Sequence, residues 1–155
     1  MKKILVIAFL TLTTMSLQAQ EGLTWHTDMT KATDISIKEN KPLFLFFTGS
    51  DWCGWCIRLQ KEVFKTLEFV KWAKENVILV ELDFPRKNEQ TEAVKMQNAQ
   101  LQQQLQVRGY PTVWFVSATK TADAKVNLNA LGSSGYVAGG PQVWIDGANQ
   151  IIKKK

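Results

Sequence analysis

The sequence has few residues that bind metals through nitrogen or sulfur. Its 155 residues include two cysteines, Cys53 and Cys56, and a single histidine, His26. A structural zinc site usually takes four ligands of the cysteine and histidine type, so this supply is too small. Covalent haem attachment needs a histidine directly after the second cysteine, and Ile57 stands there instead. The composition therefore argues against a structural zinc site and against a c-type haem.

A long hydrophobic run is missing as well. The apolar stretch over residues 4–12 is shorter than the roughly 20 apolar residues that a membrane-spanning helix needs. Two lysines precede this stretch and a short polar segment ending in Ala19 follows it, which is typical of a secretory signal peptide. We therefore expect residues 1–19 to be a signal peptide cleaved after Ala19. The product, residues 20–155, is expected to be periplasmic or secreted, with no stable membrane anchor.

Basic charge is also scarce outside the two ends of the chain. The formal net charge is +5, but two lysines fall in the expected signal peptide and three more form the tail at residues 153–155. Too little basic charge remains to form a face for nucleic acid, and we expect no nucleic-acid partner. The length and the hydrophobic fraction of 45% suit one globular domain with its own core.

Both cysteines lie in the stretch "SDWCGWC", residues 50–56. A disulfide stabilises a fold mainly by closing a long loop in the unfolded chain, and Cys53 and Cys56 enclose only two residues. Stapling is therefore a weak reason for the pair. The expected export would bring the protein to a compartment where disulfides form. Redox chemistry is therefore the leading interpretation of the cysteine pair. The alternative is a binding module that holds a client protein or a metal ion through the two sulfurs without turnover.

Periodicity places this pair between two buried strands. The apolar run at residues 41–47 predicts a strand buried on both faces, and residues 77–84 predict a second. From Cys53 onward the apolar residues recur at intervals of three and four, which predicts a helix beginning near the motif. Residues 66–76 continue it or form a second helix. A strand, a helix and a strand form a βαβ unit, whose two strands we expect to be parallel.

The remaining segments are assigned by the same patterns. We expect an edge strand and the first helix before residue 41, where His26 is a surface or packing residue. We expect a solvated helix covering the sheet within residues 87–107, a hairpin of strands at 112–116 and 125–131, and a final helix opened by Pro141.

A position at a helix start gives the two thiols different roles. The first-turn N–H groups lack partners within the helix and carry partial positive charge, so a thiolate is favoured at Cys53. Cys56 lies one turn further in and is expected to be sheltered, whereas Cys53 is expected to be exposed. Cys53 would then attack a substrate disulfide and Cys56 would resolve the mixed disulfide. This cycle needs no metal and no organic cofactor.

The motif "DWCGWC" after an apolar strand, followed downstream by "VRGYPTVWFV" at residues 107–116, resembles the thioredoxin superfamily. The likeness covers residues 25–152 and is strongest to exported thioredoxin-like proteins whose motif has tryptophan where thioredoxin has proline. It implies an α/β thioredoxin-like fold, a central mixed β-sheet flanked by helices, within residues 20–155. It also implies that Pro111 is a cis-proline and that the backbone of Tyr110 faces the cysteines. Substrate contacts are then expected at Trp52, Gly54, Trp55, Tyr110 and Pro111.

Two positions depart from thioredoxin. Thioredoxin has a buried acid on the strand before the motif, and Phe46 and Phe47 occupy the candidate positions here. Glu81 on the next strand could replace it as a proton relay to Cys56 if its side chain points inward. Trp55, inside the motif, carries no charge that would stabilise a thiolate.

We therefore expect an exported thiol–disulfide oxidoreductase, a reductase or isomerase more than a strong oxidant. Its partners would be protein or peptide thiols and disulfides, together with a redox partner that recycles the Cys53–Cys56 pair. We expect it to act as a monomer.

Overall fold

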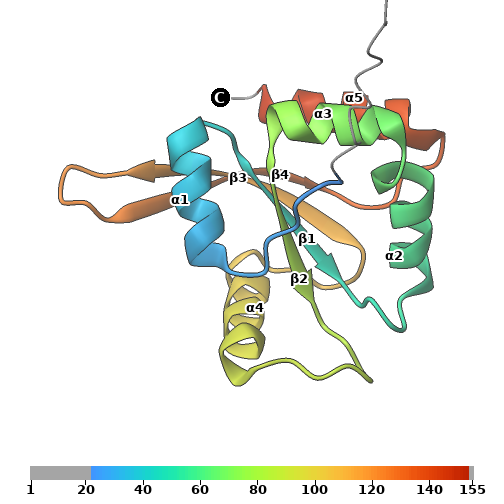
Figure 1. The fold of residues 1–155 in the computed structure, drawn as a ribbon, viewed down its shortest axis with the longest axis horizontal. Coiled ribbons are helices and arrows are strands. Elements are labelled where there is room, and N and C mark those ends of the chain that lie inside the picture. Colours follow the sequence, from blue (N-terminus) through green and yellow to red (C-terminus); the bar gives the residue numbers. More distant parts are fainter. Residues whose placement is uncertain (1–21, 154–155) are drawn as a thin grey trace, which may run out of the picture.

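The computed structural model describes residues 22–153, which form a sheet with helices on both faces (Figure 1). The helices are α1 (Met29–Glu39), α2 (Gly54–Leu59), the π-helical turn η1 (Gln60–Phe64), α3 (Leu67–Asn76), α4 (Glu92–Gln104) and α5 (Gly140–Ile152). The strands are β1 (Leu43–Thr48), β2 (Ile78–Asp83), β3 (Thr112–Lys120) and β4 (Val126–Ser134). The expected signal peptide, residues 1–19, lies outside the described residues. Within residues 22–153, no helix is both long and apolar enough to cross a membrane.

The sheet has the order β2-β1-β3-β4. β1 pairs in parallel with β2 and antiparallel with β3, and β3 pairs antiparallel with β4. The expected parallel βαβ unit and the expected mixed sheet are both confirmed.

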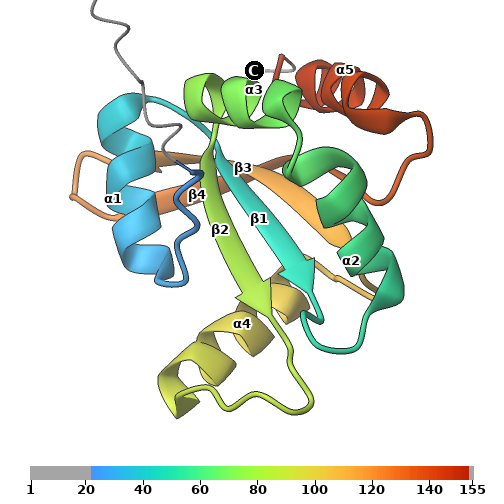
Figure 2. The ribbon, with the colours of Figure 1, turned by 45° about the vertical axis from the view of Figure 1, so that its right-hand side comes forward.

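The central strand β1 is buried along its whole length, so its alternating side chains form two separate cores. Phe44 and Phe46 face the helices α2, α3 and α5. Leu43, Leu45 and Phe47 face the other way, toward residues of α1 and α4. In Figure 2, α2, α3 and α5 gather at the upper right of the sheet, and α1 and α4 lie to the left and below.

An aromatic cluster joins the cysteine-bearing helix to the sheet. The ring of Phe44 lies 5.5 Å from Phe64 of η1, 5.8 Å from Phe69 of α3 and 5.7 Å from Trp144 of α5. Phe46 lies 5.1 Å from the same Phe64 ring. These edge-on and tilted contacts hold α2 and η1 against the end of β1.

The expected N-terminal edge strand is wrong. Of the described residues before α1, His26 alone pairs with β2, through one N–H donated to Leu79 and one carbonyl that accepts from Glu81. Pairing stops there because Asp28 caps α1, its carboxylate accepting the N–H groups of Thr30 and Lys31.

Three other expected boundaries change. The β3–β4 hairpin is longer than the predicted strands, because the two strands keep pairing with each other as far as Lys120 and Val126. In Figure 1 this hairpin projects beyond α1. Thr66 starts α3 as a separate helix by accepting the N–H of Phe69, and Thr91 starts α4 in the same way. The final helix contains Pro141 in its first turn, as expected.

Phe44 should contribute far more to stability than an apolar residue on the hairpin. Phe44→Ala removes a fully buried ring and should lower the free energy of unfolding by about 3–5 kcal/mol. Leu128→Ala, where the side chain is 40% exposed, should lower it by less than about 1 kcal/mol. Urea denaturation of both variants checks this. Similar losses in the two variants would contradict the assignment of Phe44 to the core.

Candidate functional site

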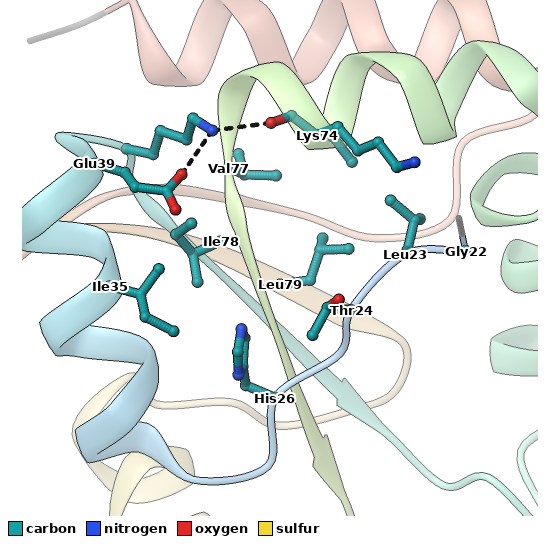
Figure 3. Close-up of a pocket in the computed structure, with 12 residues that line it drawn as sticks. Gly22, Leu23, Thr24, His26, Ile35, Glu39, Lys74, Val77, Ile78 and Leu79 are labelled. Carbon is teal, nitrogen blue, oxygen red and sulfur yellow. Dashed lines mark hydrogen bonds and ion pairs between the residues drawn. The ribbon is translucent and has the colours of Figure 1, made fainter. Parts of the chain in front are cut away.

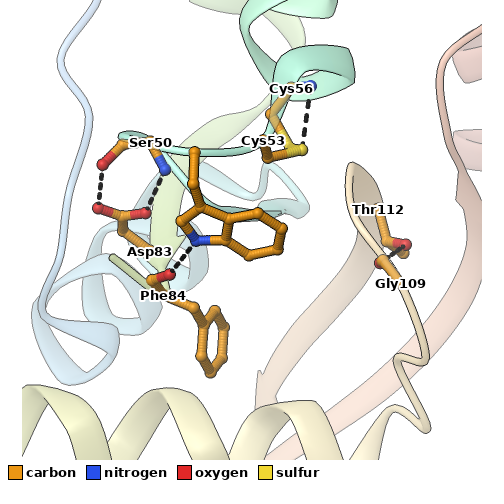
Figure 4. The surroundings of a disulfide bond; sticks show 8 residues. Ser50, Cys53, Cys56, Asp83, Phe84, Gly109 and Thr112 are labelled. Atoms are coloured by element: carbon orange, nitrogen blue, oxygen red, sulfur yellow. Dashed lines mark hydrogen bonds between the residues drawn. A yellow bond between two sulfur atoms is a disulfide. The ribbon is translucent and has the colours of Figure 1, made fainter. Parts of the chain in front are cut away.

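The two cysteines lie where β1 ends and α2 begins. Cys53 is the N-cap residue of α2, and its sulfur accepts the N–H of Cys56 at 3.2 Å. The two sulfurs form a disulfide with an S–S distance of 2.02 Å (Figure 4). The helix start predicted from the spacing is therefore confirmed, and Cys53 occupies the position where a thiolate would meet unpaired N–H groups.

Burial of the pair differs from the expectation. Cys53 is 6% exposed and Cys56 is 0% exposed, so the order is as expected but Cys53 is largely covered. The expectation of an exposed Cys53 is wrong for this disulfide form, because its sulfur is bonded to Cys56 inside the hydrophobic cluster around Phe44.

Two polar residues just before the cysteines attach this turn to the end of β2 and to the segment after it. Ser50 donates its backbone N–H and its hydroxyl to the carboxylate of Asp83 (Figure 4). Asp51 accepts the backbone N–H groups of Arg86, Lys87 and Asn88 at 2.7–3.2 Å. The N–H of Arg86, followed by those of Lys87 and Asn88, lowers the pKa of Asp51.

Trp52 connects the motif with both neighbouring loops. Its indole N–H donates to the carbonyl of Phe84 at 2.8 Å, and its ring meets Tyr110 edge-on at 5.8 Å. The guanidinium of Arg86 lies 3.9 Å from the centre of the indole ring. A Cβ at Gly49 would lie 2.4 Å from the indole, so glycine is required there. Trp52 thus packs at the site with little of its ring free.

The turn around Pro111 packs beside Trp52. The Tyr110–Pro111 peptide bond is cis, the geometry that the resemblance implied. The Tyr110 ring stacks on Phe84 at 5.3 Å, and its hydroxyl accepts a hydrogen bond from Gln102. Burial raises the pKa of Tyr110. Figure 4 shows the labelled ends of this turn, Gly109 and Thr112, which are joined by a hydrogen bond.

Trp55 lies on the outer side of the motif and is 55% exposed. Its ring is 5.1 Å from that of Tyr136, and the guanidinium of Arg58 is 5.3 Å from Trp55 and 5.2 Å from Tyr136. Glu62 accepts hydrogen bonds from the Tyr136 hydroxyl and from Arg58. The bond from Tyr136 and then that from Arg58 lower the pKa of Glu62. Gly54, beside Trp55, is exposed and has open space around it.

The sequence interpretation missed Arg58, Glu62 and Tyr136. The spacing of Arg58 and Glu62 is that of a helical ion pair and could have indicated their contact. Tyr136 could not have been found in this way, because it is 74 residues from Glu62 and reaches the site only through the fold.

Glu81 lies on the face of β2 that points toward the cysteine-bearing helix. It pairs in register with Phe46, and Leu79, two residues earlier, belongs to the same cluster as Cys53 and Cys56. Burial, followed by the negative charge of Asp83, raises the pKa of Glu81. The proton relay requires the Glu81 side chain to point inward, and the strand register is consistent with that orientation.

A hollow at the other end of β2 holds none of these residues. It has a volume of about 390 Å³ and is lined by His26, Ile35 and Lys41 among others (Figure 3). Lys41 donates to Glu39 and to the carbonyl of Lys74 there. Across the described part of the chain, no three histidine, cysteine or acidic side chains cluster as metal ligands would.

Known proteins with a thioredoxin-like domain resemble this chain. A family model described as a thioredoxin-like domain matches residues 29–123. "Disulfide bond reductase DsbH" of Chlamydia pneumoniae is 37% identical over 120 residues, which cover 77% of this chain and 72% of that protein. "Thioredoxin-related protein DsbJ" of the same organism is 30% identical over 120 residues, which cover 74% of this chain and 34% of that protein.

Solved structures of similar proteins have the same fold. "DsbH Oxidoreductase" superposes with a TM-score of 0.72 at 34% identity, covering 87% of this chain and 88% of that one. A thioredoxin from Thermus thermophilus superposes with a TM-score of 0.60 at 13% identity, covering 85% and 88% of the two chains, which shows the fold alone.

Asp51→Asn should make the protein less stable at neutral pH and remove part of its acid sensitivity. The pKa of Asp51 is lowered in the folded state, so its ionised carboxylate stabilises the fold above the ordinary aspartate pKa of about 3.9. That contribution is lost as the pH falls through the lowered value. The urea midpoint of Asp51→Asn should therefore be below that of the wild type at pH 7 and approach it near pH 2. Asp34→Asn is the control, because the Asp34 side chain on α1 is exposed. Equal midpoints of Asp51→Asn and wild type at pH 7 would refute the role of this carboxylate.

Proposed function

Because the chain belongs to the thioredoxin-like domain family and carries a CxxC pair, we propose that this thiol–disulfide oxidoreductase is an exported reductase of protein disulfides. The observation that carries the proposal is the position of Cys53. Its sulfur caps a helix start, is bonded to Cys56 and lies within one cluster that also touches Tyr110 beside Pro111.

The thiols of Cys53 and Cys56 supply both electrons that the client disulfide takes up. In the reduced protein, the Cys53 thiolate attacks one sulfur of a client disulfide, and the other client sulfur leaves as a thiolate. Cys56 then attacks Cys53, and the first client sulfur leaves. The client has gained two electrons, and the protein holds the disulfide seen here. A separate dithiol partner must reduce Cys53 and Cys56 again, and no metal or organic cofactor takes part.

The reducing direction is supported by the surroundings of the motif. Trp55 contributes no charge to stabilise a thiolate, and the charge of Arg58 beside it is balanced by Glu62. The relative at 37% identity is named as a disulfide bond reductase. An isomerase would use the same first step, and its release from the mixed disulfide would need a second client thiol in place of Cys56.

The client is proposed to contact five residues around the pair. The backbone of Tyr110 before Pro111 would pair with an extended client segment. Gly54, exposed and without close neighbours, leaves room for the client next to Cys53. Trp55 would line one side of the approach, and the part of Trp52 that Tyr110 and Arg86 leave uncovered would line the other.

Glu81 is proposed to exchange a proton with Cys56 during resolution. It faces the cysteine-bearing side of the sheet, and its raised pKa makes its carboxylate a better proton acceptor than that of an ordinary glutamate. Resolution needs Cys56 as a thiolate, so a nearby base speeds the step.

The expected signal peptide, residues 1–19, would deliver residues 20–155 to the periplasm or the outside of the cell. There the protein would act as a monomer on protein clients, with a partner that keeps it reduced.

Insulin reduction with dithiothreitol as electron donor tests the activity. The wild type should shorten the lag before insulin precipitates, and Cys53→Ser should show only the uncatalysed rate. Cys56→Ser should also lose turnover but should retain clients on Cys53 as mixed disulfides, visible on non-reducing gels.

The variant lacking both cysteines is the control for non-specific binding. An inactive wild type that binds one metal ion per chain would show that the protein is a binding module. Equal trapping by Cys53→Ser and Cys56→Ser would overturn the assigned roles.

Glu81→Gln should slow insulin reduction by about tenfold at pH 7 if Glu81 acts as the base. The wild-type rate should rise with pH through the raised pKa of Glu81, and this limb should be missing in the variant. The raised pKa also means that ionised Glu81 costs stability once the pH exceeds it, so Glu81→Gln should be more stable than the wild type at pH 8. Glu75→Gln, exposed on α3, is the control. A pH profile unchanged in Glu81→Gln would end the relay hypothesis.

A further inference from the structure

The outer side of the motif presents an aromatic surface that the redox cycle itself does not use. Trp55 is the only aromatic side chain in the described part of the chain that is largely exposed, and Tyr136 and Arg58 lie around its ring. Exposing more than half of an indole costs solvation free energy that packing elsewhere would recover. Trp52, the other tryptophan of the motif, is by contrast occupied by Tyr110, Arg86 and the Phe84 carbonyl.

Hydrogen bonds position the groups of this surface. Glu62 receives hydrogen bonds from both Arg58 (2.7 Å) and the Tyr136 hydroxyl (2.6 Å), which fixes the two groups that contact Trp55. The carbonyl of Gly135, one residue before Tyr136, accepts the indole N–H of the fully buried Trp144 at 3.0 Å. The segment that carries Tyr136 is thus attached to the core on one side and to η1 on the other.

The same segment connects the surface with the turn at Pro111. A Cβ on Gly135 would lie 3.4 Å from the carbonyl oxygen of Pro111, so the two backbones are in close contact. The next residue, Tyr136, contacts Trp55, which stands two residues after Cys53. A client whose cysteine is bonded to Cys53 and whose chain runs beside Pro111 would therefore bring a residue adjacent to that cysteine close to Trp55 and Tyr136.

The charges of the surface decide what kind of residue fits. The positive charge of Arg58 is paired with Glu62, and the Tyr136 hydroxyl is already used as a donor to Glu62. The largest apolar group of this set that faces solvent is the Trp55 ring. Because Glu62 balances the charge of Arg58, a charged client residue would meet no net opposite charge in this set, whereas an aromatic or large apolar residue would find a ring to pack on.

We propose that Trp55 and Tyr136, positioned by Arg58 and Glu62, bind an aromatic or large apolar side chain adjacent to the reacting cysteine of an extended client polypeptide. This selectivity rests on the proposed reductase function. The surface favours unfolded or misfolded chains, in which such side chains are exposed next to cysteine.

Matched peptides test the selectivity. Each peptide carries one cysteine in a mixed disulfide with glutathione, flanked by phenylalanine before it, phenylalanine after it, or serine at both positions. The Cys53 thiolate attacks the peptide sulfur and glutathione leaves as a thiolate. Cys56 then displaces the peptide thiolate, so the protein gives up two electrons. Acid-quenched samples from single turnovers of the fully reduced protein, separated by chromatography, give a second-order rate constant for each peptide.

The wild type should reduce one of the two phenylalanine peptides roughly 2- to 10-fold faster than the serine peptide, as expected for one aromatic contact. Trp55→Ala and Tyr136→Ala should bring this ratio close to one. Tyr136→Phe, which keeps the ring and loses the bond to Glu62, should keep part of it. Leu128→Ala, on the distal hairpin, should keep all of it. Because each variant is judged by a ratio, a changed redox potential that alters all peptides equally does not imitate the effect.

Two negative outcomes are distinct. Equal rates for all three peptides with the wild type, or a preference that survives both Trp55→Ala and Tyr136→Ala, would overturn the selectivity and leave the reductase function standing. Reduction of none of the peptides, together with no insulin reduction, would overturn the reductase function itself.

Discussion

The packing of Phe64 against Phe44 and Phe46 determines where the chemistry takes place. These two rings project from β1, which is buried on both faces along its whole length, and Phe64 belongs to the helical segment that follows the cysteines. The contact holds α2 at the carboxyl end of β1, so that Cys53 coincides with the helix start. Everything else at the site is arranged around this fixed helix.

The loops around the motif are joined to one another by hydrogen bonds and ring contacts. Ser50 attaches the motif turn to the last residue of β2, Asp51 attaches it to the segment that follows, and Trp52 attaches it to Phe84 and Tyr110. Tyr136, in the segment that follows β4, joins this segment to η1 through its hydrogen bond to Glu62. Such a set of contacts favours a preorganised site in which a client meets surfaces that are already in place.

Local patterns in the sequence predicted most of the fold and the reactive pair. The apolar runs of β1 and β2, the change of period at Cys53 and the proline of α5 each depend on neighbours in the chain, and each was confirmed. The prediction of an N-terminal edge strand was wrong because the carboxylate of Asp28 caps α1 and starts a helix there. The sequence pattern did not distinguish Asp28 from an ordinary surface acid. The position of Tyr136 could not be predicted from the sequence, because its contact with Trp55 depends on how the chain after β4 passes Pro111. The covering of Cys53 likewise follows from tertiary packing.

The arrangement around Trp55 has a consequence for protein engineering. The tryptophan is held by an arginine and a glutamate from its own helical segment and by a tyrosine that follows the last strand. Grafting the dipeptide Gly54–Trp55 alone onto another scaffold of this fold would transfer the indole without the groups that orient it. The smallest portable unit is the motif together with Arg58, Glu62 and Tyr136, drawn from two distant parts of the chain.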